Sequence, residues 1–129
     1  MSSELSTKSP YELVPASLVD ASAWDAVVHH SPDGWAWALS GWQRLILAVP
    51  AWGLEDHSFA VRANDRAAAV VPLQYQPSHK RLASSGWGLT GPIISADVTA
   101  SDRVELLGHI ISRVNEVAQA CGAELIELG

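Results

Sequence analysis

The pattern of apolar residues in the first part of the chain predicts a short strand followed by two helices. The strand is expected over residues 11–14. Apolar residues then recur every three or four positions, which predicts one helix capped by Asp20 or Ser22 and ending near residue 30. After a turn that contains Pro and Gly, a second helix is predicted with Ser40 as its cap, and it ends near residue 49 because Pro50 follows.

From residue 57 the spacing of apolar residues changes to two, which indicates β-strands. The stretch 57–75 is typical of a β-hairpin whose tight turn is Asn64-Asp65. Pro72 lies inside the second strand of this hairpin. Since proline donates no backbone hydrogen bond, we expect an edge position or a bulge there. Residues 80–84 can add a third strand.

The strongest helical pattern lies near the C-terminus, from about residue 101 to residue 120. Thr99 followed by Asp102 resembles a capping box, and Gly122 stands where a helix commonly ends in a left-handed residue. The helix leads into a strand over 124–128, which needs neighbours on both sides. The apolar stripe predicted to pack against the sheet consists of Val104, Leu107, Ile111, Val114, Ala118 and Cys121.

Together these elements predict an α/β domain with a mixed sheet, largely of antiparallel hairpin strands plus a C-terminal strand, flanked by helices. A chain of 129 residues buries roughly two-thirds of its unfolded surface, which is enough for one core. Residues 1–10 are polar and Ser-rich and are predicted to be a disordered tail, so the domain covers residues 11–129. The tail does not resemble a secretory signal, and no apolar run approaches the ~20 residues that span a bilayer. We therefore expect a cytoplasmic protein without a membrane span.

Charge and cysteine content exclude several classes of function. The chain has 14 acidic and 8 basic side chains and a formal net charge of −6, so this domain alone is not expected to bind nucleic acid. Its single cysteine, Cys121, excludes an internal disulfide, and its place on the apolar stripe favours a buried side chain over a nucleophile. The five histidines form no cluster at metal-ligand spacing, so no metal site is predicted.

Six tryptophans are unusual in a chain of this length, and they supply candidate binding residues. Trp35, Trp37 and Trp87 fall in predicted loops and not on helix stripes, so we expect them near a substrate groove. Arg44, on the helix after the Trp-rich loop, can meet an anionic substrate. The alternative that all four are packing or surface residues stays open. No catalytic residue can be assigned from the sequence.

Two segments that resemble phosphate-binding loops are better explained without a nucleotide. The glycines of segment 86–91 have the spacing of a dinucleotide-binding loop, but Pro92 follows where the helix should begin. The segment 95–102 precedes the long helix, whose N-terminus favours anions. It carries Asp97 and Asp102 where a phosphate would lie, and these carboxylates are better explained as helix caps.

Five short motifs follow one another in a characteristic order. They are Trp24-Asp-Ala-Val-Val-His-His-Ser-Pro-Asp33 in the first helix and the turn after it, Trp42 in the second helix, Ala69-Val-Val-Pro-Leu73 in the hairpin, Gly91-Pro-Ile93, and Ala123-Glu-Leu-Ile-Glu-Leu128. This order resembles the Fem-like acyltransferases of the GNAT superfamily. The resemblance covers nearly all of the chain from about residue 11.

The resemblance implies the acyl-CoA N-acyltransferase fold, with transfer of an acyl or aminoacyl group to an amine of a cell-wall precursor or saccharide. Fem-like proteins contain two tandem GNAT-like halves, and this chain would correspond to the first. A donor-binding half resembles Arg/Gln-x-x-Gly-x-Gly/Ala ahead of its long helix, and segment 95–102 departs from that pattern. We therefore expect acyl-CoA or aminoacyl-tRNA to bind only to a second half. This chain is expected to be inactive alone and to bind no cofactor, and it would provide scaffold and part of the acceptor groove. It would pair with the second half, or with another copy of itself, through the C-terminal strand.

A non-enzymatic carbohydrate-binding or protein-interaction module is the competing hypothesis. In such a module the tryptophans stack on sugar rings and no acyl donor is involved. Binding of a soluble glycan, without affinity for acyl-CoA or aminoacyl-tRNA, would favour it.

Overall fold

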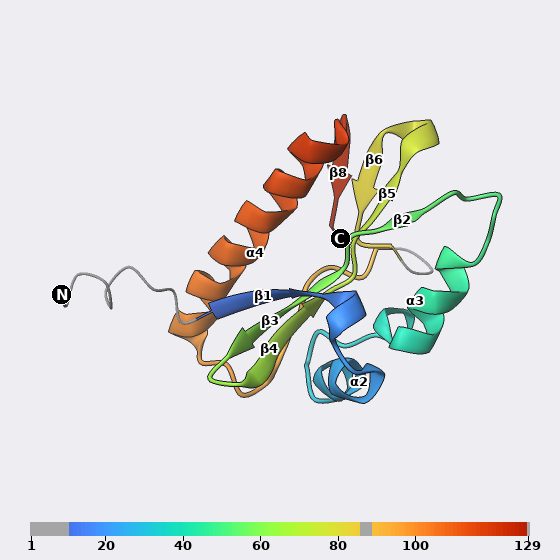
Figure 1. Ribbon diagram of the computed structural model, residues 1–129. Helices are drawn as coiled ribbons and strands as arrows, with labels where there is room; N and C mark the ends of the chain where they lie inside the picture. The colour runs from blue at the N-terminus through green and yellow to red at the C-terminus, as the bar shows by residue number, and fades with distance from the viewer. Residues whose placement is uncertain (1–10, 86–88, 129) are drawn as a thin grey trace.

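The computed structural model describes residues 11–85 and 89–128, so the predicted tail and Trp87 lie outside the described residues. The α-helices are α2 (Ala21–His29), α3 (Ser40–Leu47) and α4 (Ala100–Cys121), and short 3-10 turns form η1 (Ala16–Leu18), η2 (Ala36–Ala38) and η3 (Pro77–His79) (Figure 1). The strands are β1 (Tyr11–Pro15), β2 (Glu55–Asp56), β3 (Phe59–Ala63), β4 (Arg66–Val71), β5 (Gln74–Gln76), β6 (Arg81–Ala83), β7 (Ile93–Ile94) and β8 (Leu125–Glu127).

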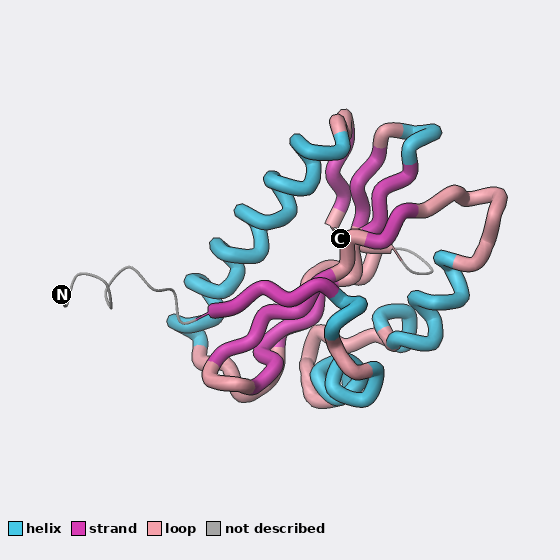
Figure 2. Tube along the Cα trace, in the orientation of Figure 1, coloured by secondary structure: helices cyan, strands magenta, loops and turns pink. Residues whose placement is uncertain are grey.

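The described strands form two four-stranded sheets, ordered β1-β3-β4-β7 and β2-β5-β6-β8 (Figure 2). All described pairings between strands are antiparallel except that of β6 with β8, which is parallel. The predicted hairpin is confirmed as β3 and β4. Its turn residues Asn64 and Asp65 have φ of 54° and 67°, the left-handed values that a two-residue hairpin turn needs. The mixed α/β class predicted from the sequence is therefore correct.

At Pro72 the chain leaves one sheet and enters the other, because Pro72 and Leu73 lie between β4 and β5. This switch, and not the expected edge strand or bulge, accommodates a residue without a backbone donor. Leu73 N donates a hydrogen bond to Ser58 Oγ at 2.9 Å, and the Leu73 carbonyl accepts one from His57 N at 2.8 Å. A serine side chain thus completes the hydrogen bonding where the strand ladder is interrupted.

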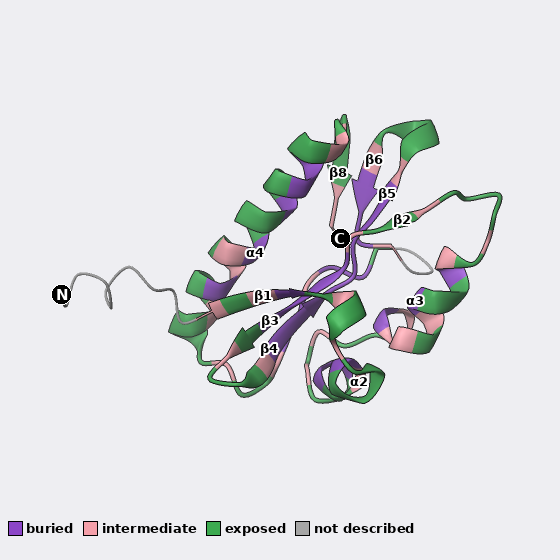
Figure 3. Cartoon of the chain, viewed as in Figure 1, coloured by how far each residue is buried: buried purple, intermediate pink, exposed green. Residues whose placement is uncertain are grey.

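The strands bury their two faces against different helices, as a side-chain period of two requires. Phe59 and Val61 of β3 pack in the same cluster as the buried face of α4. Ala60, between them, packs instead with Trp24 and Val27 of α2. Figure 3 shows the buried side of α4 turned toward the strands and its exposed side turned away. The hydrophobic core is therefore divided between the two faces of the β1-β3-β4-β7 sheet.

The predicted packing face of α4 is wrong in part. Val114 and Ala118 are buried as expected, but Val104 is 73% exposed and Ile111 is 51% exposed. Leu107 and Cys121 are only partly buried against the core. The helix carries two apolar stripes next to each other, and the sheet covers the one that the sequence interpretation passed over. Its buried members are Leu106, Ile110, Val114, Val117 and Ala118.

The two ends of α4 agree with the sequence prediction. Thr99 Oγ1 accepts a hydrogen bond from Asp102 N at 3.2 Å, which satisfies one of the free amides at the helix start. Gly122 ends the helix with φ of 75°, a left-handed conformation that suits glycine. Helix ends depend on local residues, and for that reason they can be recognised from the sequence.

The helix α3 is capped by a residue of α2, and not by Ser40 as predicted. Ser40 N donates to Asp25 Oδ1 at 2.7 Å, and the Ser40 hydroxyl donates to Asp25 Oδ2 at 2.9 Å. The neighbouring Trp24 is buried and its Nε1 donates to the Ala38 carbonyl at 2.7 Å. Asp20 does hold the cap position of α2, without a side-chain hydrogen bond. The Trp-Asp pair therefore fixes η2 and the start of α3 onto α2.

The C-terminal strand β8 forms one edge of the second sheet, beside β6. Leu125 and Ile126 in this strand are 49% and 40% exposed. Among the described residues, no helix combines the length and the apolar character that crossing a membrane requires.

Candidate binding cleft

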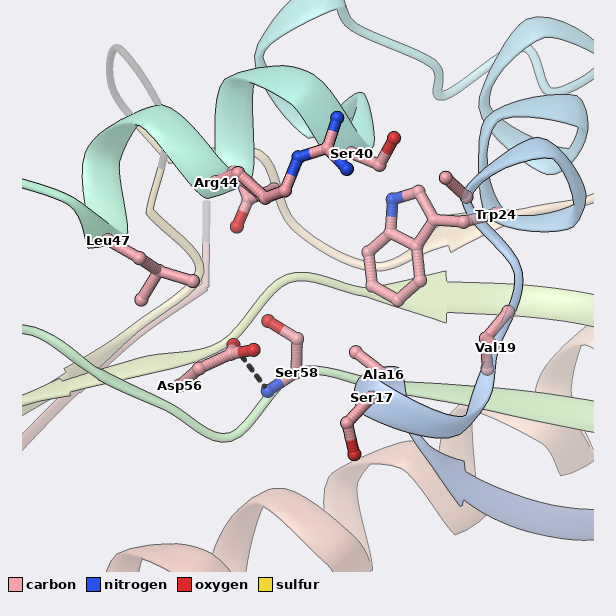
Figure 4. Close-up of a pocket in the computed structure, with 11 residues that line it drawn as sticks. Ala16, Ser17, Val19, Trp24, Ser40, Arg44, Leu47, Asp56 and Ser58 are labelled. Atoms are coloured by element: carbon pink, nitrogen blue, oxygen red, sulfur yellow. Dashed lines mark hydrogen bonds between the residues drawn. The ribbon is translucent and has the colours of Figure 1, made fainter.

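A cleft of about 380 Å³ lies between α3, the start of α2 and the segment that leads into β3 (Figure 4). This volume is within the range of about 300–1,000 Å³ that small-molecule sites occupy. Its lining combines apolar side chains with hydroxyl, carboxylate and guanidinium groups. The lining residues are Ala16, Ser17, Val19, Ala21, Trp24, Ser40, Gln43, Arg44, Leu47, Asp56 and Ser58.

Arg44 is the basic side chain in the lining of this cleft. Figure 4 shows it extending from α3 beside Ser40, with Asp56 and Ser58 on the far side of the cleft. Among the described residues no carboxylate lies within ion-pair distance of Arg44. The Asp56 carboxylate instead accepts a hydrogen bond from Ser58 N at 3.1 Å. The guanidinium therefore keeps its donors for water or for an anionic ligand.

A buried network of amide side chains supports the wall of the cleft. Gln74 Nε2 donates to Gln43 Oε1 at 2.6 Å and to Ser58 Oγ at 3.1 Å. Gln43 Nε2 in turn donates to the carbonyls of Trp37 and Ser85, each at 2.8 Å. All three members, Gln43, Gln74 and Ser58, are at least nine-tenths buried. The network joins α3 to β5 and to the connection between β2 and β3, beside the point where the hairpin strand changes sheet. The sequence analysis did not identify it.

The structure separates the tryptophans that were predicted to line a groove. Trp35 is 60% exposed and lies outside the lining of the cleft. The Trp37 ring packs against the Trp42 ring, with centroids 4.7 Å apart and an interplanar angle of 54°. The prediction for Trp87 falls outside the described residues. Of the four predicted binding residues, the structure places Arg44 in the cleft, together with Trp24, which was not among the predicted binding residues.

A second polar group involves Glu55 and His57, which alternate along the chain with the cleft residues Asp56 and Ser58. Cys121 Sγ is 3.5 Å from His57 Nε2, and Glu55 Oε1 is 3.7 Å from the same nitrogen. Burial raises the pKa of the Cys121 thiol, and the negative charge of Glu55 raises it further. A raised pKa disfavours the free thiolate. The side chain of Cys121 is only partly buried, where its place on the apolar stripe predicted a buried one. The cluster itself was missed because Cys121 is 64 residues away from His57 in sequence.

The acidic segment before α4 is occupied by local interactions. Arg66 Nη2 forms an ion pair with Asp97 Oδ2 at 2.7 Å. Asp97 and Asp102 both border a cleft of about 320 Å³ beside β1 and β4. Arg66 borders this cleft too and offsets the charge of Asp97, so the carboxylate of Asp102 is the group that opposes the binding of a phosphate there.

Comparison of this chain with protein-family models, with curated proteins and with solved structures gives no match. The class of the protein is therefore defined by its own structure, as a mixed α/β domain with a polar cleft that contains Arg44.

Proposed function

We propose that this chain is a GNAT-like domain that provides the acceptor side of a Fem-like N-acyl or aminoacyltransferase. The acceptor would be an amine of a cell-wall precursor or saccharide that also carries a negative charge. The observation that carries this proposal is the Arg44 guanidinium, which lines a cleft of ligand size without an ion-pair partner among the described residues.

The order of the elements supports the family. The chain proceeds from a strand through two helices to an antiparallel hairpin, then to the strands β6 and β7, the long helix α4 and a final strand that runs parallel to β6. The resemblance to Fem-like proteins implies the same succession of helices, hairpin, loop, helix and strand. The Trp24-Asp25 motif of that resemblance has a structural role here, because both side chains hold the segment that begins α3 above the cleft.

The chemistry of the cleft favours an acceptor with a phosphate or carboxylate. A guanidinium donates hydrogen bonds in a fixed fork that matches either group, and such charge-assisted bonds are stronger than neutral ones. Ser17 and Ser40 line the same cleft: the Ser17 hydroxyl can donate to or accept from a sugar hydroxyl, and the Ser40 hydroxyl, which donates to Asp25, can accept from one. The indole of Trp24 adds an apolar surface to the wall.

The acyl donor, on this proposal, belongs to a second GNAT-like half that binds acyl-CoA or aminoacyl-tRNA. The segment ahead of α4 supports this division, because Asp102 repels a pyrophosphate and the basic residue beside it, Arg66, is already paired with Asp97. Titration of this chain with acetyl-CoA should leave its melting temperature unchanged. Saturable stabilisation, which mass action requires of any ligand of the native state, would contradict the division of roles.

The direct test is calorimetric titration with a soluble peptidoglycan precursor that carries a diphosphate. Arg44→Ala should weaken binding by roughly 10- to 150-fold, the equivalent of a charge-assisted hydrogen bond of about 1.5–3 kcal/mol. Arg62→Ala is the matched control, since Arg62 is exposed on β3 and does not line the cleft. No binding by the unmodified chain, or equal binding by both variants, would refute the proposal.

A non-enzymatic carbohydrate-binding module is the second candidate, and the exposed tryptophans favour it. Trp35 and Trp52 are 60% and 43% exposed, and flat aromatic faces of this kind stack on sugar rings. Such a module would bind neutral glycans, and Trp35→Ala would weaken this binding while Arg44→Ala would not. Binding that requires Arg44 and an anionic group would exclude it.

A further inference from the structure

We propose that Glu55, His57 and Cys121 form a binding site for a divalent cation of the Zn²⁺ type. The three residues come from β2, from the connection between β2 and β3, and from the last turn of α4. Their donor atoms, a carboxylate oxygen, an imidazole nitrogen and a thiol sulfur, all lie within 4.8 Å of one another. This proposal is independent of the function proposed for the cleft.

Two of the three separations between the donors are close to those around one shared ion, and the third, from Cys121 Sγ to Glu55, is at most 4.8 Å. Tetrahedral Zn²⁺ with bonds of about 2.3 Å to sulfur and about 2.0–2.1 Å to nitrogen and oxygen has a sulfur–nitrogen edge of about 3.6 Å. The corresponding nitrogen–oxygen edge is about 3.3 Å. The observed Cys121 Sγ to His57 Nε2 distance is 3.5 Å, and the His57 Nε2 to Glu55 Oε1 distance is 3.7 Å. The ion would therefore need shifts of only a few tenths of an ångström along these two edges.

The same geometry does not suit a cysteine nucleophile. In a catalytic triad the nucleophile bonds to one nitrogen of the histidine, and the carboxylate bonds to the other. Here the Cys121 sulfur and the Glu55 carboxylate both approach His57 Nε2. Convergence of three donors on one point is the arrangement expected of metal ligands.

The types of donor select the metal. Sulfur, nitrogen and oxygen ligands in a four-coordinate arrangement are typical of Zn²⁺, whereas Mg²⁺ and Ca²⁺ prefer oxygen ligands alone. Glu55 is exposed, and His57 and Cys121 are partly buried, so an ion can reach the site from solvent. His57 also borders a cleft of about 340 Å³, from which water can supply a fourth ligand. Arg113 borders this cleft too, and its charge is paired with Glu116.

The backbone around the site is held in place. His57 N donates to the Leu73 carbonyl at 2.8 Å, which fixes the histidine beside the point where the strand changes sheet. Cys121 directly precedes the left-handed Gly122 that ends α4, and Gly122 N donates to the Gln119 carbonyl. Because both ligands are attached to ordered backbone, less conformational entropy is lost when an ion binds.

The test is titration of the reduced, full-length chain with Co²⁺, which reports on its ligands through its absorption spectrum. We expect one Co²⁺ per chain, with a thiolate-to-metal charge-transfer band and the intense visible bands of tetrahedral coordination. Cys121→Ser should abolish the charge-transfer band, and His57→Ala and Glu55→Gln should each weaken Zn²⁺ binding by about 100-fold or more in competition with a chromophoric chelator. His29→Ala and Glu12→Gln, at exposed positions away from the site, are the matched controls and should bind as the unmodified chain does.

A second measurement keeps the proposal testable if a variant folds poorly. Zn²⁺ should raise the melting temperature of the unmodified chain in a saturable way, and a chelator should reverse the effect. Absence of a thiolate band in the unmodified chain would overturn the proposal. Zn²⁺ affinity that is unchanged by Cys121→Ser and His57→Ala would overturn it as well.

Discussion

The packing face of α4 gives a prediction that can be worked from the structure. Leu106 has no exposed surface, and its replacement by Ala removes buried carbon atoms and leaves a cavity, at a cost of about 2–5 kcal/mol in the free energy of unfolding. Ile111 is 51% exposed, so Ile111→Ala removes only about half of the buried apolar surface that the same change would remove from a fully buried isoleucine. The higher helix propensity of Ala also returns about 0.4 kcal/mol. We expect a cost below about 1 kcal/mol at this position.

Thermal and urea unfolding, followed by circular dichroism, measure the difference. An unfolding entropy of about 2.1 cal/mol/K per residue, over 129 residues, gives about 0.27 kcal/mol/K. A loss of about 3 kcal/mol by Leu106→Ala then lowers the melting temperature by about 11 °C. A larger loss from Ile111→Ala than from Leu106→Ala would refute the reasoning, because α4 would then present the neighbouring stripe to the sheet.

Three further predictions concern the helix cap, the titration of Tyr11 and the edge strand. Asp25→Ala should cost about 1–2 kcal/mol in chemical denaturation, because α3 loses its cap, while Asp25→Asn keeps one acceptor and should cost less. Burial raises the pKa of Tyr11, and the negative charges of Glu105 and Asp102 raise it further. The neutral phenol of Tyr11 therefore contributes to the free energy of unfolding in full below pH ~10, and this contribution is lost as pH rises through the folded-state pKa. Tyr11→Phe should remove this contribution, and an unchanged loss of stability at high pH in the variant would contradict the cause given. Self-association through the exposed strand β8 should appear in sedimentation velocity as concentration rises, and Ile126→Lys should suppress it. A monomer at all concentrations would count against pairing of this strand.

The features that the sequence predicted correctly depend on neighbouring residues. The hairpin turn requires two consecutive left-handed residues, and Asn64-Asp65 between apolar strands satisfies this requirement in any tertiary context. The ends of α4 are specified in the same way by Thr99, three residues before Asp102, and by Gly122. Hydrogen bonds and backbone conformations of this kind involve residues close together in the sequence, so the sequence pattern predicts them directly.

The features that the sequence did not predict depend on contacts between distant segments. Asp25 caps α3 from a position 15 residues earlier, so the local pattern indicated Ser40 as the cap instead. The choice between the Leu106 stripe and the Ile111 stripe is made by the sheet, since both stripes have helical spacing. The position of Arg44 in the cleft could be predicted in part. Arg44 lies on an amphipathic helix, and a charged residue of such a helix is not needed to pack the helix against the core.

The two sites proposed here share one extended segment, and its alternation explains how they coexist. Successive side chains of an extended segment point in opposite directions. Asp56 and Ser58 line the cleft under α3, whereas Glu55 and His57 approach Cys121 at the end of α4. Asp56 and Ser58 also border the second cleft beside His57, so the two sites are close neighbours along this segment. The switch of strands after Pro72 holds this segment in place, because Leu73 bonds to both His57 and Ser58. Arg44 and Glu55 therefore report on different chemistry: an effect that follows Arg44 and not Glu55 belongs to the cleft, and an effect that follows Glu55 and not Arg44 belongs to the cation site.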